Sequence, residues 1–404
     1  MGYPAKKVFL LTILILLLYV FPSQAALTTL EIAQERAKGI ETSNKESWIK
    51  EFGTRREEFT KKYGTSFAFL FNYDQQWIVR SKENSGDSGA ACYWNVELMQ
   101  ELWPGASIDM EFETDRGKGV DKFLPTFSIL NTNSGDNIDF YIPRLYFQQD
   151  LVNERVYLAA GKLDLSDWFD YSVVAGCGDT QFTSSALVNN PIIPFPAKGL
   201  GAMVTLKPYD WLYFQSGAST AKANSTKTGL SDGFNSTFFI NELGFTPKIG
   251  NLEGNYRFIF HLTHEKLERF LEDRTKNNTV GFALSFDQAI TERLTLFLRY
   301  GFDDPKVNSM EYFWSFGGQL SEPFPGRKYD YLGLAVAQSI TGKDYREYNG
   351  EGTSYAETIC ELYYSYNFKT IFTLTPNIQM VIDPDANKDS STAVVMGLRL
   401  VLSF

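Results

Sequence analysis

The carboxy-terminal segment, residues 392–404, alternates between two kinds of side chain along its whole length. Successive side chains of an extended strand point to opposite sides, so the alternation assigns these residues to two faces. The apolar face comprises Val394, Met396, Leu398, Leu400, Leu402 and Phe404, and the other comprises Val395, Gly397, Arg399, Val401 and Ser403. A strand of about 9–11 residues with one apolar face is typical of a closed β-barrel in an outer membrane. An edge strand of a soluble sheet is the alternative interpretation.

The composition of the 404 residues fits a chain in which lipid-facing and water-facing side chains alternate. The chain has 33 Phe and 22 Tyr, and aromatic residues make up 15% of it, yet its mean hydropathy is only −0.22. Many rings without overall hydrophobicity are expected where aromatic girdles mark both membrane interfaces. A net charge of −10 leaves no basic stripe to neutralise phosphates, so nucleic acid is excluded as a partner.

The sequence divides into three parts. Residues 1–25 indicate a secretory signal peptide, because Lys6 and Lys7 precede an apolar run that ends before the small-residue site at Ala25. Residues 26–63 are charged and helical in character, and we treat a plug or a periplasmic collar as a hypothesis for them. Residues 64–404 are predicted to form a transmembrane β-barrel.

The barrel segment contains about 16 strand-like runs, which is an even number, as a closed antiparallel bacterial barrel requires. The first run begins near Thr65 and places Phe67, Phe69 and Phe71 on its outer face. The later runs are 90–100, 107–114, 139–149, 154–163, 199–207, 211–218, 237–246, 252–262, 279–289, 293–301, 311–320, 329–339, 354–366, 369–381 and the terminal strand. The fold class is therefore an all-β membrane protein preceded by a short helical segment. The terminal strand must pair with the first strand to leave no open edge.

The connections between these runs alternate between short and long. Short turns face the periplasm and long loops face outward in outer-membrane barrels. This parity places both termini in the periplasm and makes residues 164–198 the third external loop, whereas 263–278 and 341–353 are two further long loops. The aromatic terminal residue Phe404 fits an address read by outer-membrane assembly machinery, so that machinery is an expected partner together with outer-membrane lipid.

Several charged residues fall on the polar faces of these strands. A charge that faces lipid at the bilayer midplane costs about 2–4 kcal/mol, so we expect these side chains to point into the lumen. The cationic set is Arg144, Arg257, Arg299 and Arg399, and the acidic set is Glu253, Asp287, Glu357 and Glu361. Each can contact solute or form a structural ion pair on the wall.

No catalytic or metal-binding arrangement emerges from the sequence. His261 and His264 are the only histidines, and no helical Glu lies between them, so a metal site is disfavoured. Cys92, Cys177 and Cys360 are too scattered for a disulfide framework, and at most one bridge could form. We expect neither enzymatic activity nor a cofactor.

The segment from residue 157 to 211 resembles the carbohydrate-selective porin family of bacterial outer membranes (OprB-type). The resemblance is carried by residues 157–164, 167–170, 181–182, 187–191, 199–201 and 207–211, and it continues at 375–379, 384, 397–399 and Phe404. It covers most of the chain after Trp48, and the block from Gly161 to Gly201 is its most specific part. The resemblance implies a 16-stranded porin that admits sugars, with the third loop folded into the pore as a constriction. Cys177, Cys360 and the long charged start depart from the commoner pattern of this family.

The residues of the third loop suit such a path independently of the resemblance. The sequence places Asp164, Asp167, Trp168, Phe169, Asp170 and Tyr171 close together. Sugars present apolar C–H faces and many hydroxyls, so rings that stack and charges that hydrogen-bond fit weak binding at several sites. The predicted solute-contacting set is Arg144, Asp164, Asp167, Trp168, Asp170, Arg257, Arg299, Glu361 and Arg399.

We therefore expect a passive diffusion channel for small carbohydrates and other small hydrophilic solutes in the outer membrane of a Gram-negative bacterium. The two alternatives are a general porin without solute preference and a structural or adhesive barrel whose pore is closed.

Overall fold

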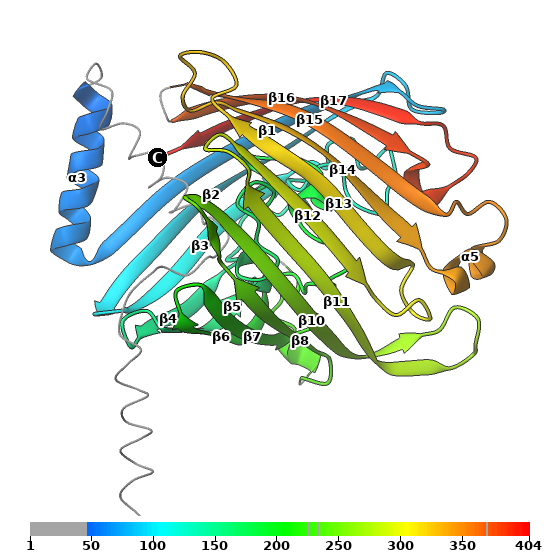
Figure 1. Cartoon of the computed structure of the whole chain (residues 1–404), viewed down its shortest axis with the longest axis horizontal. Coiled ribbons are helices and arrows are strands. Elements are labelled where there is room, and N and C mark those ends of the chain that lie inside the picture. Colours follow the sequence, from blue (N-terminus) through cyan, green and yellow to red (C-terminus); the bar gives the residue numbers. More distant parts are fainter. Residues whose placement is uncertain (1–46, 225, 233, 369–370) are drawn as a thin grey trace, which may run out of the picture.

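The computed structural model describes residues 47–404 except 225, 233 and 369–370 (Figure 1). The expected signal peptide, residues 1–25, and residues 26–46 of the charged segment lie outside the described residues. Among the described residues, no helix is both long and apolar enough to cross a membrane.

Sixteen strands form one closed antiparallel barrel in which each strand pairs with its neighbours along the chain. The closure is made by the last and first strands, where Arg399 lies opposite Asp74. The strands are β1 (Thr65–Arg80), β2 (Ser88–Trp103), β3 (Ala106–Arg116), β4 (Leu145–Leu151), β5 (Val156–Leu163), β6 (Gly199–Tyr209), β7 (Leu212–Thr220), β8 (Thr237–Phe245), β10 (Leu252–Glu268), β11 (Thr275–Ala289), β12 (Leu294–Phe302), β13 (Met310–Ser321), β14 (Tyr331–Thr341), β15 (Ala356–Phe368), β16 (Phe372–Ile382) and β17 (Ala393–Ser403). The two-residue strand β9 (Lys248–Ile249) pairs only with β10, in the turn that precedes it. The predicted fold class and the closing pair of strands are confirmed.

The two faces of each strand differ as the sequence pattern predicts. In β1 the inward-facing residues Asn72, Asp74 and Gln76 are buried, whereas Tyr73 and Trp77 on the opposite face are exposed. In β17 the side chain of Arg399 is fully buried and Met396 and Leu398 are exposed. Large apolar side chains are thus exposed on the outer surface, while polar side chains are enclosed, which is the arrangement that lipid around a barrel stabilises.

A helix precedes the barrel and lies beside it. Helix α3 (Ser47–Tyr63) runs along the outside of the barrel, next to the start of β1 (Figure 1). The ring centroids of Phe59 and the outward-facing Phe67 are 6.1 Å apart, and the hydroxyl of Thr60 donates to the carbonyl oxygen of Thr65 at 3.1 Å. The described part of the charged segment therefore contacts the outer face of β1 and not the barrel interior.

Three strand boundaries differ from the sequence expectation by about four residues or more. Strand β4 begins at Leu145 and not at residue 139, because Pro143 has no N–H group for the ladder and Tyr141 forms only an isolated bridge to Glu113. Strands β10 and β11 extend to Glu268 and from Thr275, so the expected long loop at 263–278 is mostly paired strand. This extension carries polar residues on both faces, so it lacks the alternation that identifies the membrane-spanning part.

The helical elements within the barrel segment are short. They are η1 (Leu165–Asp167), α4 (Ser185–Val188), η2 (Leu230–Asp232), α5 (Lys343–Asn349) and η3 (Pro384–Ala386). Helix α5 occupies part of the expected long loop 341–353, and η1 and α4 belong to the connection between β5 and β6.

Two long connections, residues 117–144 and 164–198, fill part of the barrel interior. Their buried apolar residues form one cluster with inward-facing residues of the wall. From the connections the cluster takes Val120, Leu130, Phe169, Phe182 and Leu187, and from the wall it takes Ile259, Phe297, Phe313, Ile359 and Tyr363. The ring centroid of Phe182 lies 4.9 Å from that of Tyr363 and 5.9 Å from that of Phe297. The hydrophobic effect therefore fixes these connections against the wall formed by β10 to β15.

Candidate functional site

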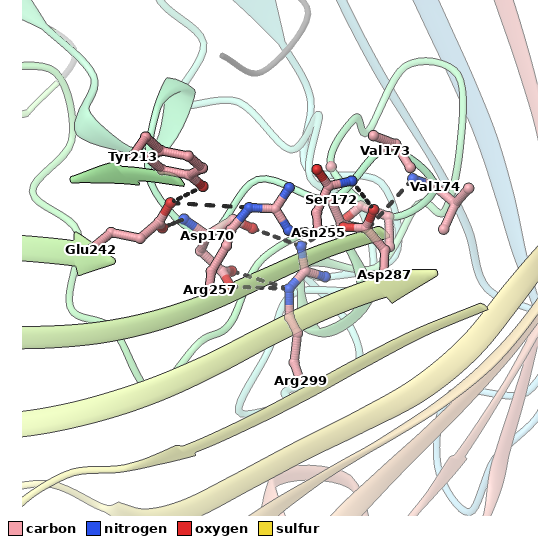
Figure 2. A network of polar contacts seen from close by, with 12 residues as sticks. Asp170, Ser172, Val173, Val174, Tyr213, Glu242, Asn255, Arg257, Asp287 and Arg299 are labelled. Atoms are coloured by element: carbon pink, nitrogen blue, oxygen red, sulfur yellow. Dashed lines mark hydrogen bonds and ion pairs between the residues drawn. The ribbon is translucent and has the colours of Figure 1, made fainter. Parts of the chain in front are cut away.

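The guanidinium group of Arg299 on β12 holds the connection 164–198, here called the inner loop. Its Nη1 donates to the carbonyl oxygen of Leu187 at 2.9 Å. Its Nη2 donates to the carbonyl oxygens of Asp170, Ala175 and Val188 at 3.0, 2.8 and 3.1 Å. Its Nε lies 3.2 Å from the carboxylate of Asp170 (Figure 2). One buried cation therefore satisfies carbonyl groups from three separate stretches of the inner loop, and these groups would otherwise lack partners.

A carboxylate on β8 supports the same stretch of the inner loop. Glu242 accepts hydrogen bonds from the backbone N–H of Asp170 at 2.9 Å and from the hydroxyl of Tyr213 at 2.7 Å (Figure 2). It also accepts from Nε2 of Gln215 at 3.0 Å. Nη1 of the neighbouring Arg257 lies 2.8 Å from the carboxylate of Asp287, and its Nε lies 4.0 Å from that of Glu242. Charges of both signs alternate along this wall, so each buried ion has a partner.

A second pair of wall residues holds the other half of the inner loop. The carboxylate of Glu361 on β15 accepts from the backbone N–H groups of Thr183 and Ser184 at 2.7 and 3.0 Å, just before α4 begins. The guanidinium of Arg399 on β17 donates to the carbonyl oxygen of Gln181 at 2.6 Å and to that of Gly178. Strands β8, β12, β15 and β17 therefore bind the inner loop at points around the barrel.

Arg144 joins the inner loop to the opposite wall. Its Nε donates to the carboxylate of Glu111 on β3 at 2.7 Å, and its Nη1 donates to the carboxylate of Asp167 at 2.7 Å. Asp164 begins the η1 turn, since its carboxylate accepts from the backbone N–H of Ser166 at 3.0 Å. The acidic start of the inner loop thus faces the acidic strand β3, with one arginine between them.

A water-accessible cavity of about 360 Å³ lies between β2, β3 and the two inward-folded connections. Its walls carry seven carboxyl groups and two cationic groups. The acidic residues are Glu111, Glu113, Asp115, Asp136, Asp164, Asp167 and Asp179, and the cationic residues are Arg144 and Lys198. Tyr93 and Tyr141 are its aromatic residues. The excess of carboxyl groups in this acidic cavity attracts positively charged solutes and repels negatively charged ones.

Burial and neighbouring charges set the ionisation of the cavity. Burial raises the pKa of Asp167 from its ordinary 3.8 to about 7, although Arg144 acts in the opposite direction. Burial would lower the pKa of Lys198, but the carboxylate of Glu113, 3.6 Å from its Nζ, and that of Glu111 raise this pKa above its ordinary value. Lys198 therefore remains charged at neutral pH, whereas the carboxyl group of Asp167 titrates near neutral pH.

The nine residues that the sequence predicts to contact solute divide into two groups. Arg144, Asp164 and Asp167 line the acidic cavity. The other six are buried, with at most 3% of each exposed: Trp168, Asp170, Arg257, Arg299, Glu361 and Arg399. The ring of Trp168 packs against those of Tyr146 and Tyr157, with centroids 5.5 and 6.4 Å away. The geometry gives these six residues a role in positioning the inner loop.

An acidic row on β3, three of whose residues line the cavity, is absent from the set predicted from the sequence. In this strand Asp109, Glu111, Glu113 and Asp115 alternate with apolar or uncharged residues, so all four share the inward face. The same rule of alternation that identified the terminal strand would have found this row. Lys198 and Asp179 lie in irregular segments, where no sequence period predicts their position.

Comparison with known proteins assigns the chain to a family. Residues 91–404 match the family described as carbohydrate-selective porin, OprB family. The chain belongs to the OprB family. Among solved structures, OprB of Pseudomonas putida at high pH superposes with a TM-score of 0.75 at 16% identity, covering 87% of this chain and 97% of that one. This likeness supports the same 16-stranded fold for this OprB-family chain.

Two curated relatives match part of this chain and part of their own length. Porin AaxA of Chlamydia abortus is 24% identical over 268 residues, which make up 64% of this chain and 56% of the relative. Porin B of Pseudomonas aeruginosa is 22% identical over 280 residues, which make up 58% of this chain and 61% of the relative. The chain thus matches somewhat over half the length of these relatives. Family membership indicates a porin of the outer-membrane β-barrel class, and the structural likeness shows the barrel fold.

Proposed function

We propose that this OprB-family chain is a passive diffusion channel that admits small carbohydrates and other small hydrophilic solutes. The observation that carries the proposal is the acidic cavity inside a closed barrel, bounded on one side by an inner loop that four wall strands hold in place. A porin needs a narrow, water-accessible and firmly shaped passage, and a loop fixed by buried hydrogen bonds supplies such a shape. Passive diffusion through such a channel requires no energy source.

We infer that the passage favours cations over anions among charged solutes. Its described lining has an excess of carboxyl groups over cationic groups, and rings of charge of one sign select ions of the opposite sign. Neutral sugars interact with the same groups by donating hydroxyl hydrogen bonds to the carboxylates, and conduction requires that the total binding stay weak enough for release.

A general porin without sugar preference is the second candidate. The observation that favours it is the burial of Trp168 and Phe169, whose rings are 3% and 1% exposed and so offer no stacking face to a solute in the acidic cavity. A structural or adhesive barrel with a closed pore is the third candidate function.

We propose an orientation with both termini at the periplasmic side of a bacterial outer membrane. The first and last strands begin and end among the short turns, and Phe404 packs on Phe69, with ring centroids 6.0 Å apart. Outer-membrane barrels keep short turns in the periplasm. Contact of Phe404 with the assembly machinery belongs to this proposal.

Planar bilayers with the purified protein separate the three functions. Current that is reduced reversibly by added maltose supports a sugar channel, and open current that maltose leaves unchanged supports a general porin. A silent bilayer, with protein shown by circular dichroism to be folded, would establish the closed barrel and reject both channels.

A further inference from the structure

A second cavity, of about 440 Å³, lies at the short-turn end of the barrel. Residues of the three short connections 152–155, 210–211 and 246–251, and the strand ends beside them, form its walls. This volume lies within the range of about 300–1,000 Å³ that small-molecule sites occupy. The cavity shares none of its lining residues with the acidic cavity.

The charges of this turn-end cavity balance, in contrast to those of the acidic cavity. Three acidic and three basic residues line it: Glu154, Asp210, Glu253, Arg155, Lys207 and Lys248. Two ion pairs use four of them, with 2.7 Å between Arg155 Nη2 and an Asp210 carboxylate oxygen and 2.9 Å between Lys248 Nζ and one of Glu253. A neutral ligand with many donors and acceptors therefore matches this lining better than an ion does.

Two aromatic rings stand at the rim of the turn-end cavity. Tyr209 and Trp211 are 58% and 51% exposed, and both line the cavity. Their rings are stacked, with centroids 5.6 Å apart and an interplanar angle of 7°. The ring of Trp211 is also stacked on that of Phe245, with centroids 6.3 Å apart and an interplanar angle of 17°. The three rings form a rigid apolar platform with polar tips, which suits the C–H face of a sugar ring.

Some residues that line the turn-end cavity belong to the network of polar contacts that holds the inner loop (Figure 2). Tyr213, Gln215 and Asn255 line the cavity. The hydroxyl of Tyr213 donates to Glu242, which accepts from the N–H of Asp170. Nε2 of Gln215 also donates to the carbonyl oxygen of Trp168 at 2.6 Å. A ligand in this cavity thus contacts side chains that bind the inner loop directly or through one carboxylate.

We propose that the turn-end cavity is a second solute site, for a neutral carbohydrate that packs against the ring platform of Tyr209 and Trp211 and bonds through its hydroxyls to the paired charges and amides around it. The inference rests on the proposed function, because it supplies the channel with a sugar site at the end opposite the long connections. It assigns the sugar-binding rings to Tyr209 and Trp211 in place of the buried Trp168.

Equilibrium binding of maltose to the full-length protein in detergent tests this site. Saturation-transfer NMR detects weak binding, and Trp211→Ala is expected to raise the apparent Kd for maltose about fivefold to tenfold. Trp103→Ala is the matched control, because Trp103 is 53% exposed at another short turn and lines neither cavity. Trp103→Ala should leave the Kd within about twofold, and Trp211→Phe should restore most of the affinity. Gluconate and glucosamine should bind no more strongly than maltose.

The outcomes separate the site from the channel. Absence of maltose binding in the wild type, or equal affinities of Trp211→Ala and Trp103→Ala, would contradict the proposed sugar site. If the same preparations conduct in bilayers, the proposed channel function still holds. Silent bilayers together with loss of binding in Trp211→Ala alone would overturn the channel and support the site. If Trp211→Ala does not fold, the Kd of Tyr209→Leu decides in the same way.

Discussion

Arg299 and Asp170 form a fully buried ion pair that joins strand β12 to the inner loop, and the Nε atom lies 3.2 Å from the carboxylate. The same carboxylate accepts from the backbone N–H of Asn190 at 2.7 Å. Two parts of the inner loop that are 20 residues apart are therefore tied to each other and to the wall through one charged pair. This arrangement gives the loop a single position, which a constriction requires.

Removal of the cation from this pair should destabilise the protein strongly. Arg299→Met leaves the Asp170 carboxylate buried without its cation and several carbonyl oxygens buried without a donor, so we expect the free energy of unfolding to fall by about 3–5 kcal/mol. Urea unfolding in detergent measures this change. Arg293→Met, at a side chain that is 63% exposed, should change the free energy by no more than about 0.5 kcal/mol. Equal losses in the two variants would contradict the role of Arg299.

Ion selectivity should depend on pH through Asp167. Its pKa is raised from 3.8 to about 7, so the folded protein gains a negative charge in the acidic cavity as the pH rises through about 7. The preference for K⁺ over Cl⁻, from reversal potentials, should therefore increase between about pH 6 and pH 8. Asp167→Asn should remove this step.

The same raised pKa has a consequence for stability. Between pH 3.8 and about 7, Asp167 is protonated in the folded state, whereas the unfolded chain has already lost this proton. The contribution of Asp167 to the free energy of unfolding is therefore complete below pH 3.8 and is lost as the pH rises through about 7. Asp136→Asn is the control for both effects, since Asp136 lines the cavity with its side chain 76% exposed. Asp136→Asn should leave the step in place, and a step that survives in Asp167→Asn would refute the assignment.

Trp168 should matter for stability and not for solute binding. Trp168→Phe removes part of a buried ring between Tyr146 and Tyr157, so we expect a loss of about 1–3 kcal/mol in the free energy of unfolding. The block of current by maltose should stay within about twofold of the wild type. A larger change in block without loss of stability would show that the ring contacts solute.

A glycine on β12 allows the inner loop to approach the wall. A Cβ atom at Gly301 would lie 2.2 Å from Cγ2 of Ile192, a buried residue of the loop. Gly301→Ala should therefore cost about 1–3 kcal/mol through overpacking. Gly352→Ala, where no atom lies within 4 Å of the added Cβ, should have little effect on urea unfolding, and similar midpoints for the two variants would contradict this packing.

Alternation along the chain was sufficient to predict the barrel, because lipid on one side and the lumen on the other impose a period of two. Arg257, Arg299 and Arg399 were placed on the inner face for that reason, and all three are buried there. The same pattern does not reveal whether an inward side chain meets water or another segment. That outcome depends on the path of irregular connections: residues 164–198 bind Arg299 and Arg399 through long-range contacts, whereas Arg257 pairs with Asp287 on the neighbouring strand.

Outside the membrane-spanning part, the pattern loses its information because both faces meet water. The extension of β10 to Glu268 illustrates this loss, since His264, Glu265 and Lys266 follow each other without an apolar face. The acidic residues of β3 lie inside the spanning part and obey the alternation, so their inward direction was predictable from the sequence.

The reversal potential across a KCl gradient in planar bilayers tests the central claim most directly, namely that solutes pass through the acidic cavity. The wild type should conduct and prefer K⁺ over Cl⁻, and the double variant Glu113→Gln, Asp179→Asn, which removes two of the seven carboxyl groups of that cavity, should lose a large part of this preference while it still conducts. A wild type that is silent or prefers Cl⁻, or a double variant with unchanged selectivity, would contradict the claim.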